Sequence, residues 1–222
     1  MEAKIPKTHI VFFDFDNTIT KFDVIDDMMP RFSKNDDWVE LEKKWRANKI
    51  GSRECLKGQI EGMSVDKKNL DKYLAKIELD PYFKKLLRLL KTKNVKVVIL
   101  SDNFDYILRN ILKKHGITDM TIFSNKIGFN NGKIKTSFPY TNKTCKRRQC
   151  GHCKTNNLLA NTGTNCHITY VGDGLSDACP SKHAHTVFSK DDLTRHCREN
   201  NMKHIPIKNL KRVYNYFQER LI

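Results

Sequence analysis

The most constraining feature of the sequence is an apolar run, residues 10–13, that leads directly into two carboxylates, Asp14 and Asp16. An uninterrupted apolar run is typical of a central parallel strand that is covered on both faces. Side chains alternate along an extended chain, so Asp14 and Asp16 should point the same way at the end of this strand. Ligands of open α/β sheets bind outside the carboxyl ends of the strands. The sequence therefore predicts an acidic site there, and a hard cation such as Mg²⁺ would relieve the repulsion between the two charges.

Two further apolar runs end in polar residues in the same way. Residues 95–100 lead into a Ser-Asp-Asn sequence at 101–103, and residues 167–171 lead into Gly-Asp-Gly at 172–174, with Asp177 close behind. One pair of carboxylates at a strand end is weak evidence for a site. Three polar strand ends in one chain are much stronger evidence that these segments build one site together.

The order of the expected elements indicates an α/β fold. The residues Asn130-Asn131-Gly132 tolerate positive φ and predict a hairpin over 126–136. Between the first two strands the apolar pattern is helical only. We therefore predict a Rossmann-like parallel sheet with a helical cap inserted between its first and second strands. Strands are expected over 9–15, 95–100, 121–124, 167–171 and 184–188, and the clearest helices over 82–93, 105–115 and 210–221.

Two domains are expected. Residues 1–21 and 81–222 would form the α/β core, and residues 22–80 would form the helical cap, with Pro81 at the boundary. A chain of 222 residues is long enough for such a core and a small second lobe.

The composition limits the class of protein. No apolar stretch approaches the ~20 residues that a membrane helix needs, and the first residues, Met1 to Lys4, lack the apolar segment of a secretory signal. We therefore expect a cytoplasmic protein without a membrane partner, in which the seven cysteines are not paired by default. The 41 Lys and Arg against 25 Asp and Glu give a net charge of +16. Such a charge attracts polyanions, although the helical spacing of many lysines favours a solvated basic surface. Nothing in the sequence specifies an oligomeric state.

Taken in order, the polar segments resemble the four motifs of the haloacid-dehalogenase (HAD) phosphohydrolase superfamily. Asp-x-Asp-x-Thr stands at 14–18, a Ser at Ser101, a Lys at Lys154, and Gly-Asp-Gly-x-x-Asp at 172–177. The resemblance implies hydrolysis of a phosphomonoester through an aspartyl-phosphate. Asp14 would be the nucleophile, and Asp16 would protonate the leaving alcohol and then activate water.

The same resemblance assigns roles to the other polar residues of these motifs. Mg²⁺ would be held by Asp14, the carbonyl of Asp16, Asp173 and Asp177. The phosphoryl oxygens would be held by Ser101 and Lys154, with further contacts from Thr18 and Asn103.

Three of these roles have alternatives. Thr18 could be a turn hydroxyl, and Asn103 could be a helix N-cap. Lys146 or the Arg pair at 147–148 could take the role given to Lys154.

The expected cap resembles that of the phosphoserine-phosphatase-like subfamily, and a closing cap restricts substrates to small phosphorylated metabolites. Residues 13–16, 145–154 and 170–180 are similar to phosphoethanolamine/phosphocholine phosphatases. Residues 51–56 are similar instead to the methionine-salvage phosphatases that act on 2-hydroxy-3-keto-5-methylthiopentenyl-1-phosphate. Both substrate classes stay open, and nucleic acid is not expected as a substrate.

Six cap residues are candidates for substrate recognition. Asp23 could meet a substrate ammonium, or it could be a helix N-cap favoured by the dipole, and the same two interpretations apply to Asp26 and Asp27 in the same acidic turn. Lys57 stands about where phosphoserine phosphatases use Arg for the substrate carboxylate, and a lysine cannot make the same bidentate contact. Trp38 and Trp45 could enclose a quaternary ammonium, or they could pack in the core of the cap.

A cysteine-rich segment precedes Lys154. Cys145, Cys150, His152 and Cys153 could hold zinc, although Cys150-x-x-Cys153 lacks a second pair. Cys153 could also act as a redox switch because the charge of the adjacent lysine lowers a thiol pKa. A reduced, packed loop is the third interpretation.

Two alternatives to the hydrolase are considered. A pyrophosphatase or phosphotransferase would use the same aspartyl-phosphate. A polyanion- or RNA-binding protein with a vestigial site would account for the charge of +16 but not for the intact motifs.

Overall fold

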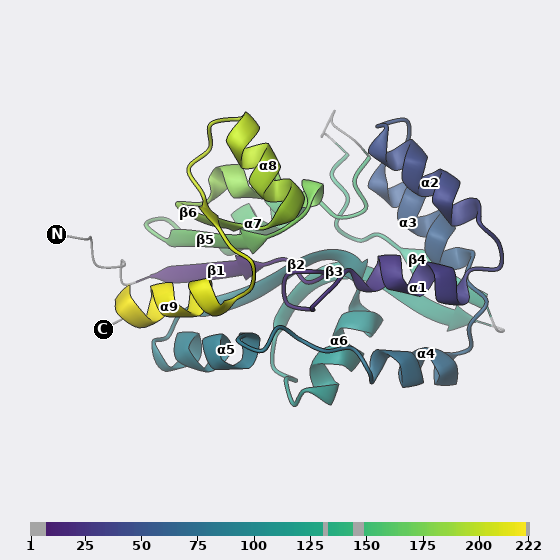
Figure 1. The fold of residues 1–222 in the computed structure, drawn as a ribbon, viewed down its shortest axis with the longest axis horizontal. Coiled ribbons are helices and arrows are strands. Elements are labelled where there is room, and N and C mark those ends of the chain that lie inside the picture. Colours follow the sequence, from purple (N-terminus) through teal and green to yellow (C-terminus); the bar gives the residue numbers. More distant parts are fainter. Residues whose placement is uncertain (1–7, 131–132, 144–148, 221–222) are drawn as a thin grey trace.

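The computed structural model describes residues 8–130, 133–143 and 149–220. Within these residues the centre of the fold is a sheet with the strand order β4-β3-β2-β1-β5-β6-β7 (Figure 1). Neighbouring strands are parallel except β3 and β4, which are antiparallel. The strands are β1 (His9–Phe13), β2 (Lys96–Phe104), β3 (Thr121–Asn130), β4 (Lys133–Ser137), β5 (His167–Gly172), β6 (Thr186–Ser189) and β7 (Ile205–Pro206). The predicted α/β class with a mostly parallel sheet is confirmed.

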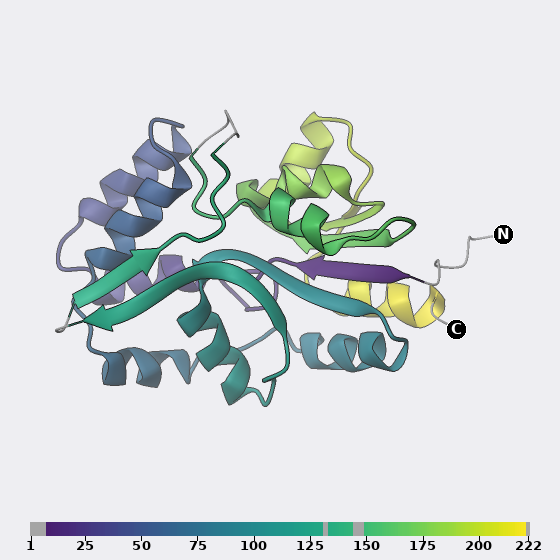
Figure 2. The same ribbon diagram turned by 180° about the vertical axis from the view of Figure 1, so that it is seen from behind.

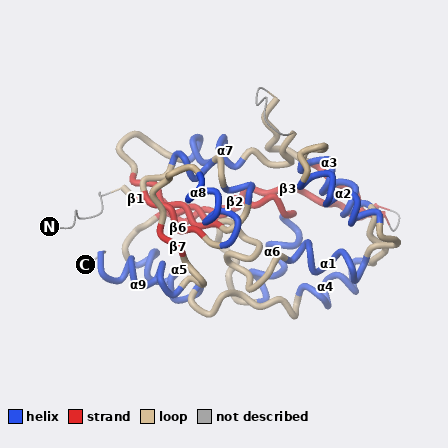
Figure 3. Tube along the Cα trace, turned by 45° about the horizontal axis from the view of Figure 1, so that its top comes forward, coloured by secondary structure: helices blue, strands red, loops and turns tan. Residues whose placement is uncertain are grey.

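Helices cover both faces of this sheet. Figures 1 and 2 show α5, α6 and α9 on one face and α7 and α8 on the other. The helices α1 to α4 gather at the end of the molecule away from α9 and the start of β1 (Figure 3). The helices are α1 (Val24–Phe32), α2 (Asp37–Arg46), α3 (Ser52–Glu61), α4 (Lys67–Leu74), α5 (Phe83–Thr92), α6 (Asp105–Lys114), α7 (Lys154–Asn161), α8 (Asp191–Glu199) and α9 (Lys211–Arg220).

Strand β1 forms the middle of the core because its side chains alternate between two apolar layers. Val11 and Phe13 belong to the larger cluster, with residues of α5, α6 and α9. Ile10 and Phe12 face the other way and pack with Leu158 of α7. All five residues of β1 are nearly or fully buried. The apolar run therefore forms a buried strand, and the position of this strand in the core fixes where the carboxylates after it lie.

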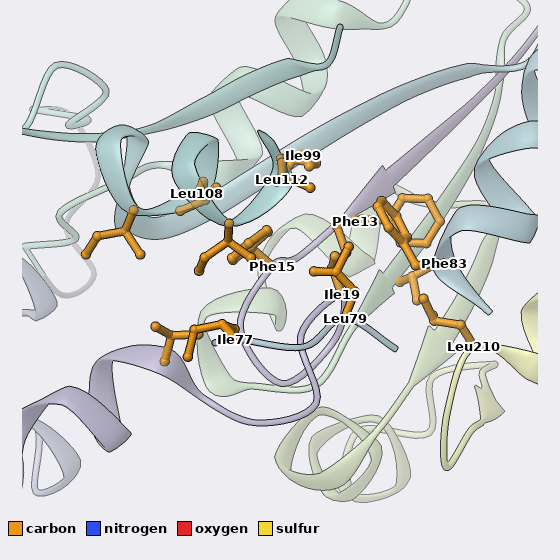
Figure 4. Close-up of a cluster of buried hydrophobic side chains, with 14 of the residues drawn as sticks. Phe13, Phe15, Ile19, Ile77, Leu79, Phe83, Ile99, Leu108, Leu112 and Leu210 are labelled. Atoms are coloured by element: carbon orange, nitrogen blue, oxygen red, sulfur yellow. The ribbon is translucent and has the colours of Figure 1, made fainter. Parts of the chain in front are cut away.

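The larger cluster continues past the end of β1 into the turn that carries the carboxylates. Figure 4 shows Phe13, Phe15 and Ile19 packed among side chains of neighbouring elements. The rings of Phe13 and Phe83 meet edge to face, with centroids 5.8 Å apart. Phe15 and Ile19 are fully buried, so the turn between them is anchored at both ends by the core.

The expected elements differ from the observed ones mainly at their ends. β1 stops at Phe13 rather than at residue 15, and β2 runs on to Phe104 through a register irregularity after Leu100. β3 and β4 pair antiparallel as predicted for the hairpin, while the turn residues 131–132 lie outside the described residues. Helix α8 and the short β7 were not expected.

The alternative that Asn103 is a helix N-cap is wrong, because Asn103 lies within β2 and Phe104 is the N-cap of α6.

Helix α3 is tied to the remainder of the described chain at both of its ends. Glu61 of α3 accepts hydrogen bonds from the backbone N–H and the hydroxyl of Thr136 on β4, at 2.9 and 2.6 Å. At the other end of α3, the N–H of Arg53 donates to the carbonyl of Gln149, at 3.2 Å. A side chain at Gly51 would collide with Gln149, so this close approach requires glycine. The insertion is helical as predicted, and its division from the core at residues 21 and 81 stays a prediction.

In the part of the chain that the structure describes, no helix has both the length and the apolar character needed to span a bilayer.

Candidate active site

The three polar strand ends predicted from the sequence lie beside one another. β2, β1 and β5 are adjacent parallel strands, so their carboxyl ends reach the same edge of the sheet. Asp14 follows β1, Ser101 lies near the end of β2, and Asp173 follows β5. All three line one cavity.

Lys154 is the cation of this site. It is the first residue of α7 and only 3% exposed. Its Nζ donates to Oδ1 of Asp14 at 2.6 Å and to Oδ1 of Asp177 at 2.8 Å. Burial by itself lowers the pKa of Lys154, but the two carboxylates raise it well above its ordinary value, so the ammonium stays charged. For Asp14 the balance is the reverse, because burial raises its pKa and Lys154 opposes that shift.

Asp177 is fully buried and accepts four hydrogen bonds. Its Oδ1 accepts from Lys154 and from the hydroxyl of Tyr170, the latter at 2.6 Å. Its Oδ2 accepts from the backbone N–H groups of Asp173 and Gly174, at 3.1 and 3.0 Å. Both oxygens are thus occupied by protein donors. This arrangement suits a residue that fixes the Asp173 loop and the lysine better than it suits a direct metal ligand.

Asp173 is held by the turn that follows β1. The hydroxyl of Thr18 donates to its Oδ1 and the amide of Asn17 donates to its Oδ2, both at 2.9 Å. Burial raises the pKa of Asp173. Thr18, which was expected to contact the substrate, contacts this carboxylate instead and does not line the cavity with Asp14.

Asp16 is held by two elements at once. The amide Nδ2 of Asn103 donates to both of its carboxylate oxygens at 3.0 Å, and the backbone N–H of Val24 donates to Oδ1 at 3.1 Å. Burial raises the pKa of Asp16 to about 7, although these hydrogen bonds oppose the shift. Asn103 lines the cavity, so the residue expected to bind the phosphoryl group also orients the carboxylate two residues after Asp14.

Ser101 is fixed through its backbone as well as its side chain. Its hydroxyl oxygen accepts from the N–H of Asn103 at 3.0 Å. Its carbonyl accepts from Nδ1 of His152 at 2.7 Å, while Nε2 of His152 accepts from the amide of Asn157 at 2.7 Å. Burial lowers the pKa of His152 to about 3, so the ring is neutral. His152 therefore locks the segment before Lys154 onto the end of β2.

These contacts bear on the zinc hypothesis for the cysteine-rich segment. Both nitrogens of His152 already have partners, which leaves no lone pair for a metal. Cys145 lies outside the described residues. Among the residues that the structure describes, the group of His, Cys, Asp or Glu side chains close enough to share a metal ion is Asp14, Asp173 and Asp177. His152 is therefore not a zinc ligand.

The donor set of the acidic site fits a hard cation. One carboxylate oxygen from each of Asp14, Asp173 and Asp177 lies within 4.8 Å of the others. With Asp16, four carboxylates lie around the ammonium of Lys154, which pairs directly with two of them, Asp14 and Asp177, so negative charge is in excess among these residues. Oxygen ligands and net negative charge are what Mg²⁺ requires.

The cavity above these residues has a volume of about 330 Å³, and the cap helices form its other wall. That wall carries the carboxylates of Asp23, Asp26 and Glu42, of which Glu42 pairs with Arg46 at 2.7 Å. Burial raises the pKa values of all three carboxyl groups. The wall is therefore acidic, and a larger hollow of about 940 Å³ adjoins it and shares Trp45 with it.

Asp23 has features of both predicted roles. Its side chain caps α1 by accepting from the N–H of Asp26 at 3.0 Å, and it also lines the cavity. Trp45 lines the cavity, whereas Trp38 packs against the hydrophobic core. The two-tryptophan cage is therefore wrong.

Lys57 is not brought to the cavity. It is exposed on α3, where its charge interacts with that of Glu61. Gln59 and Arg46 line the cavity instead. The amide of Gln59 donates to Glu42 at 3.4 Å. Two residues along a helix correspond to about 200° of rotation, so Lys57 and Gln59 face opposite ways. The helical spacing of the buried Cys55 and Gln59 was the signal that could have identified Gln59.

Comparison with known proteins places these features in context. Residues 9–213 match the family model described as Putative Phosphatase. A 2-hydroxy-3-keto-5-methylthiopentenyl-1-phosphate phosphatase of Bacillus pumilus is 28% identical over 201 residues, which cover 89% of this chain and 86% of that protein. A HAD family hydrolase of Salmonella enterica superposes with a TM-score of 0.71 at 18% identity, over 93% of this chain and 69% of that one. A phospho-aspartyl intermediate analogue of phosphoserine phosphatase superposes with a TM-score of 0.69 at 17% identity, over 96% and 99% of the two chains.

The hydrogen bond from Tyr170 to Asp177 yields a stability prediction. Tyr170→Phe removes a hydroxyl from a fully buried carboxylate while keeping the ring. Because a hydrogen bond to a charged group contributes about 1.5–3 kcal/mol, the free energy of unfolding should fall by that amount in urea denaturation. The matched variant Tyr216→Phe alters a half-buried tyrosine on α9 and should change it by less than about 0.5 kcal/mol. Equal effects of the two variants would show that the contact to Asp177 is unimportant.

Proposed function

Because the chain belongs to the putative phosphatase family and is a phosphatase of the HAD superfamily, we propose that it hydrolyses the phosphomonoester of a small metabolite with Mg²⁺. The reaction would pass through an aspartyl-phosphate on Asp14. The observation that carries the proposal is the buried pairing of Asp14 with Lys154 at 2.6 Å, in a small cavity whose opposite wall is formed by the cap helices.

Asp14 is suited to be the nucleophile. Its backbone N–H donates to the carbonyl of Val171 at 2.9 Å, which fixes the residue at the end of β1. Its Oδ1 is held by Lys154, and the residue lines the cavity. In the first step, an Asp14 oxygen forms a bond to phosphorus and the bond to the leaving alcohol breaks. In the second step, water attacks that phosphorus and returns Asp14 to its free form.

Asp16 is suited to move the protons. It follows Asp14 by two residues, lines the same cavity, and is kept in place by Asn103 and Val24. It would donate a proton to the leaving alcohol oxygen in the first step and remove one from the attacking water in the second.

The remaining polar residues would stabilise the transferring phosphoryl group. An ammonium has three N–H donors, of which Lys154 gives one to Asp14 and one to Asp177, so the third is left for a phosphoryl oxygen. Ser101 and Asn103 line the cavity beside it. Bound Mg²⁺, held by Asp14, Asp173 and the carbonyl of Asp16, would supply the charge that offsets the phosphoryl oxygens. Asp177 would hold Lys154 and the loop of Asp173 in place rather than bind Mg²⁺ directly.

The cap wall favours a substrate whose unreacting end is an amine. Asp23, Asp26 and Glu42 face the cavity, and Arg46 is the basic cap residue that lines it with them. Phosphoethanolamine and phosphocholine carry such a cationic end. The methylthiopentenyl phosphate named for the Bacillus pumilus relative has none, and Trp45 and Leu56 offer the apolar contact that it would use. We expect a phosphatase of small metabolites to act in the cytoplasm, and this location is part of the same proposal.

The test of the reaction is Asp14→Asn, a nearly isosteric change that removes the nucleophilic oxygen. Phosphate release from small phosphomonoesters with Mg²⁺ should fall by at least about a thousandfold. The control Asp119→Asn alters a fully exposed carboxylate and should leave turnover unchanged. Substantial phosphate release by Asp14→Asn, with the control normal, would reject Asp14 as nucleophile.

The test of the substrate is Asp23→Asn, which removes the charge but keeps a side chain that can cap α1. For phosphoethanolamine or phosphocholine, KM should rise by up to about tenfold while kcat changes little, because the contact is to an unreacting group. For the methylthiopentenyl phosphate, KM should not change. If the amine substrates are also unaffected, Asp23 is only a helix cap. If phosphoserine or a nucleotide is the best substrate in the same phosphate-release assay, the amine assignment is wrong.

A further inference from the structure

Lys190 lies directly after β6 and contacts the turn that follows β1. Its Nζ donates to the backbone carbonyl of Asn17 at 2.9 Å and to the side-chain Oδ1 of Asn17 at 2.7 Å. Its backbone N–H donates to the carbonyl of Gly172, the last residue of β5, at 3.0 Å. One residue thus connects the ends of β1, β5 and β6, the edge of the sheet that carries the acidic site.

Asn17 connects Lys190 to Asp173 through its side chain. Its amide Nδ2 donates to Oδ2 of Asp173 and to Oδ2 of Asp191, both at 2.9 Å. Asn17 has φ +51°, a left-handed conformation that asparagine adopts more readily than most residues. The turn therefore directs the asparagine side chain across to the neighbouring loop.

Lys190 and the carboxylates of Asp173 and Asp191 together fix which end of the Asn17 carboxamide faces Asp173. The ammonium has donors only, so it accepts no hydrogen bond and must meet Oδ1. With Oδ1 fixed by Lys190, the amide nitrogen points at the carboxylates of Asp173 and Asp191. Without the lysine, Oδ1 would lose its ammonium donor, and the carboxamide would be held from its Nδ2 end alone.

The segment that begins at Lys190 also holds the backbone of Asp173. The N–H of Leu193 donates to the carbonyl of Asp173 at 2.7 Å. The carboxylate is fixed through Asn17 and Thr18, and the carbonyl is fixed through Leu193. Residues 190–193 and the turn after β1 therefore hold Asp173 from two sides.

We propose that Lys190 is a positioning residue for the magnesium site, which acts through Asn17 to orient the carboxylate of Asp173. The proposal rests on the Mg²⁺-dependent function proposed above. It assigns the Lys190 ammonium no contact with the substrate or with the metal.

Because Lys190 is charged, an electrostatic role and a positioning role predict opposite changes in Mg²⁺ affinity when it is replaced. Lys190 is a cation near the acidic site, and its Nζ also lies 3.8 Å from Oδ2 of Asp191. If Lys190 acted on the metal only through its charge, its removal would strengthen the binding of a second cation. If it acts by orienting Asp173, its removal weakens Mg²⁺ binding. The two roles predict opposite changes.

The experiment uses the full chain and Mg²⁺ alone, without substrate. Thermal unfolding is followed over a series of Mg²⁺ concentrations, since a ligand that binds the folded state raises Tm according to its affinity. The variants are Lys190→Met, which keeps the length of the side chain without its charge, and Asn17→Gly, which tolerates positive φ and removes the carboxamide. The double variant and the exposed-lysine control Lys203→Met complete the set.

Lys190→Met should raise the Mg²⁺ concentration for half of the Tm shift by about tenfold or more, the usual effect of losing an outer contact to a metal ligand. The double variant should bind Mg²⁺ no worse than Asn17→Gly alone, because Lys190 acts through Asn17. In a separate phosphate-release assay at saturating Mg²⁺, Lys190→Met should keep the KM of the wild type. Lys203→Met should match the wild type throughout.

Unchanged or tighter Mg²⁺ binding by Lys190→Met would overturn the proposal, and so would additive losses in the double variant. A fall in Tm without Mg²⁺ and no change in Mg²⁺ affinity would reduce Lys190 to a structural residue and overturn it as well. A wild type whose Tm does not respond to Mg²⁺ would instead overturn the proposed metal site, and this inference with it.

Discussion

The buried ammonium of Lys154 is the interaction on which the rest of the site depends. It lies between the carboxylates of Asp14 and Asp177, at 2.6 and 2.8 Å, and is itself almost fully buried. Removing one partner of a buried ion pair costs about 3–5 kcal/mol because the other charge is left without compensation. The lysine is the first residue of α7, so the segment before this helix must be fixed as well. His152 provides this through its hydrogen bond to the carbonyl of Ser101.

The excess of carboxylates around this one lysine links the fold to the chemistry. Three adjacent parallel strands end at one edge of the sheet, and each brings acidic or polar residues there because of its place in the sheet order. The ammonium of Lys154 alone cannot balance four carboxylates, so the site favours further positive charge, part of which Lys190 supplies beside Asn17. The cap wall repeats this imbalance on a smaller scale, with Asp23, Asp26 and Glu42 beside Arg46. Both observations favour a cation and a small phosphorylated substrate in the same cavity.

The strand ends could be predicted from sequence because a buried strand and the polar residues after it are local in the chain. The partners of those polar residues could not. Thr18 contacts Asp173 and Asn103 contacts Asp16 across 155 and 87 positions, and residue type alone does not give such pairs. Lys57 was placed wrongly because the orientation of α3 depends on its packing against the cavity and on the loop at Gln149. Helix α8 was missed because its apolar face is little more than two buried residues, one of them a cysteine.

The most direct test of the mechanism is the detection of the phosphoryl group on Asp14. Wild-type protein would be mixed with Mg²⁺ and its best small phosphomonoester and quenched during turnover. Borohydride then reduces an aspartyl-phosphate to homoserine, which peptide mass spectrometry can locate. The proposed mechanism predicts homoserine at position 14, in larger amount in Asp16→Asn, where the step that activates water is impaired. Phosphate release by the wild type with no modification at position 14, or with modification of another carboxylate, would contradict it.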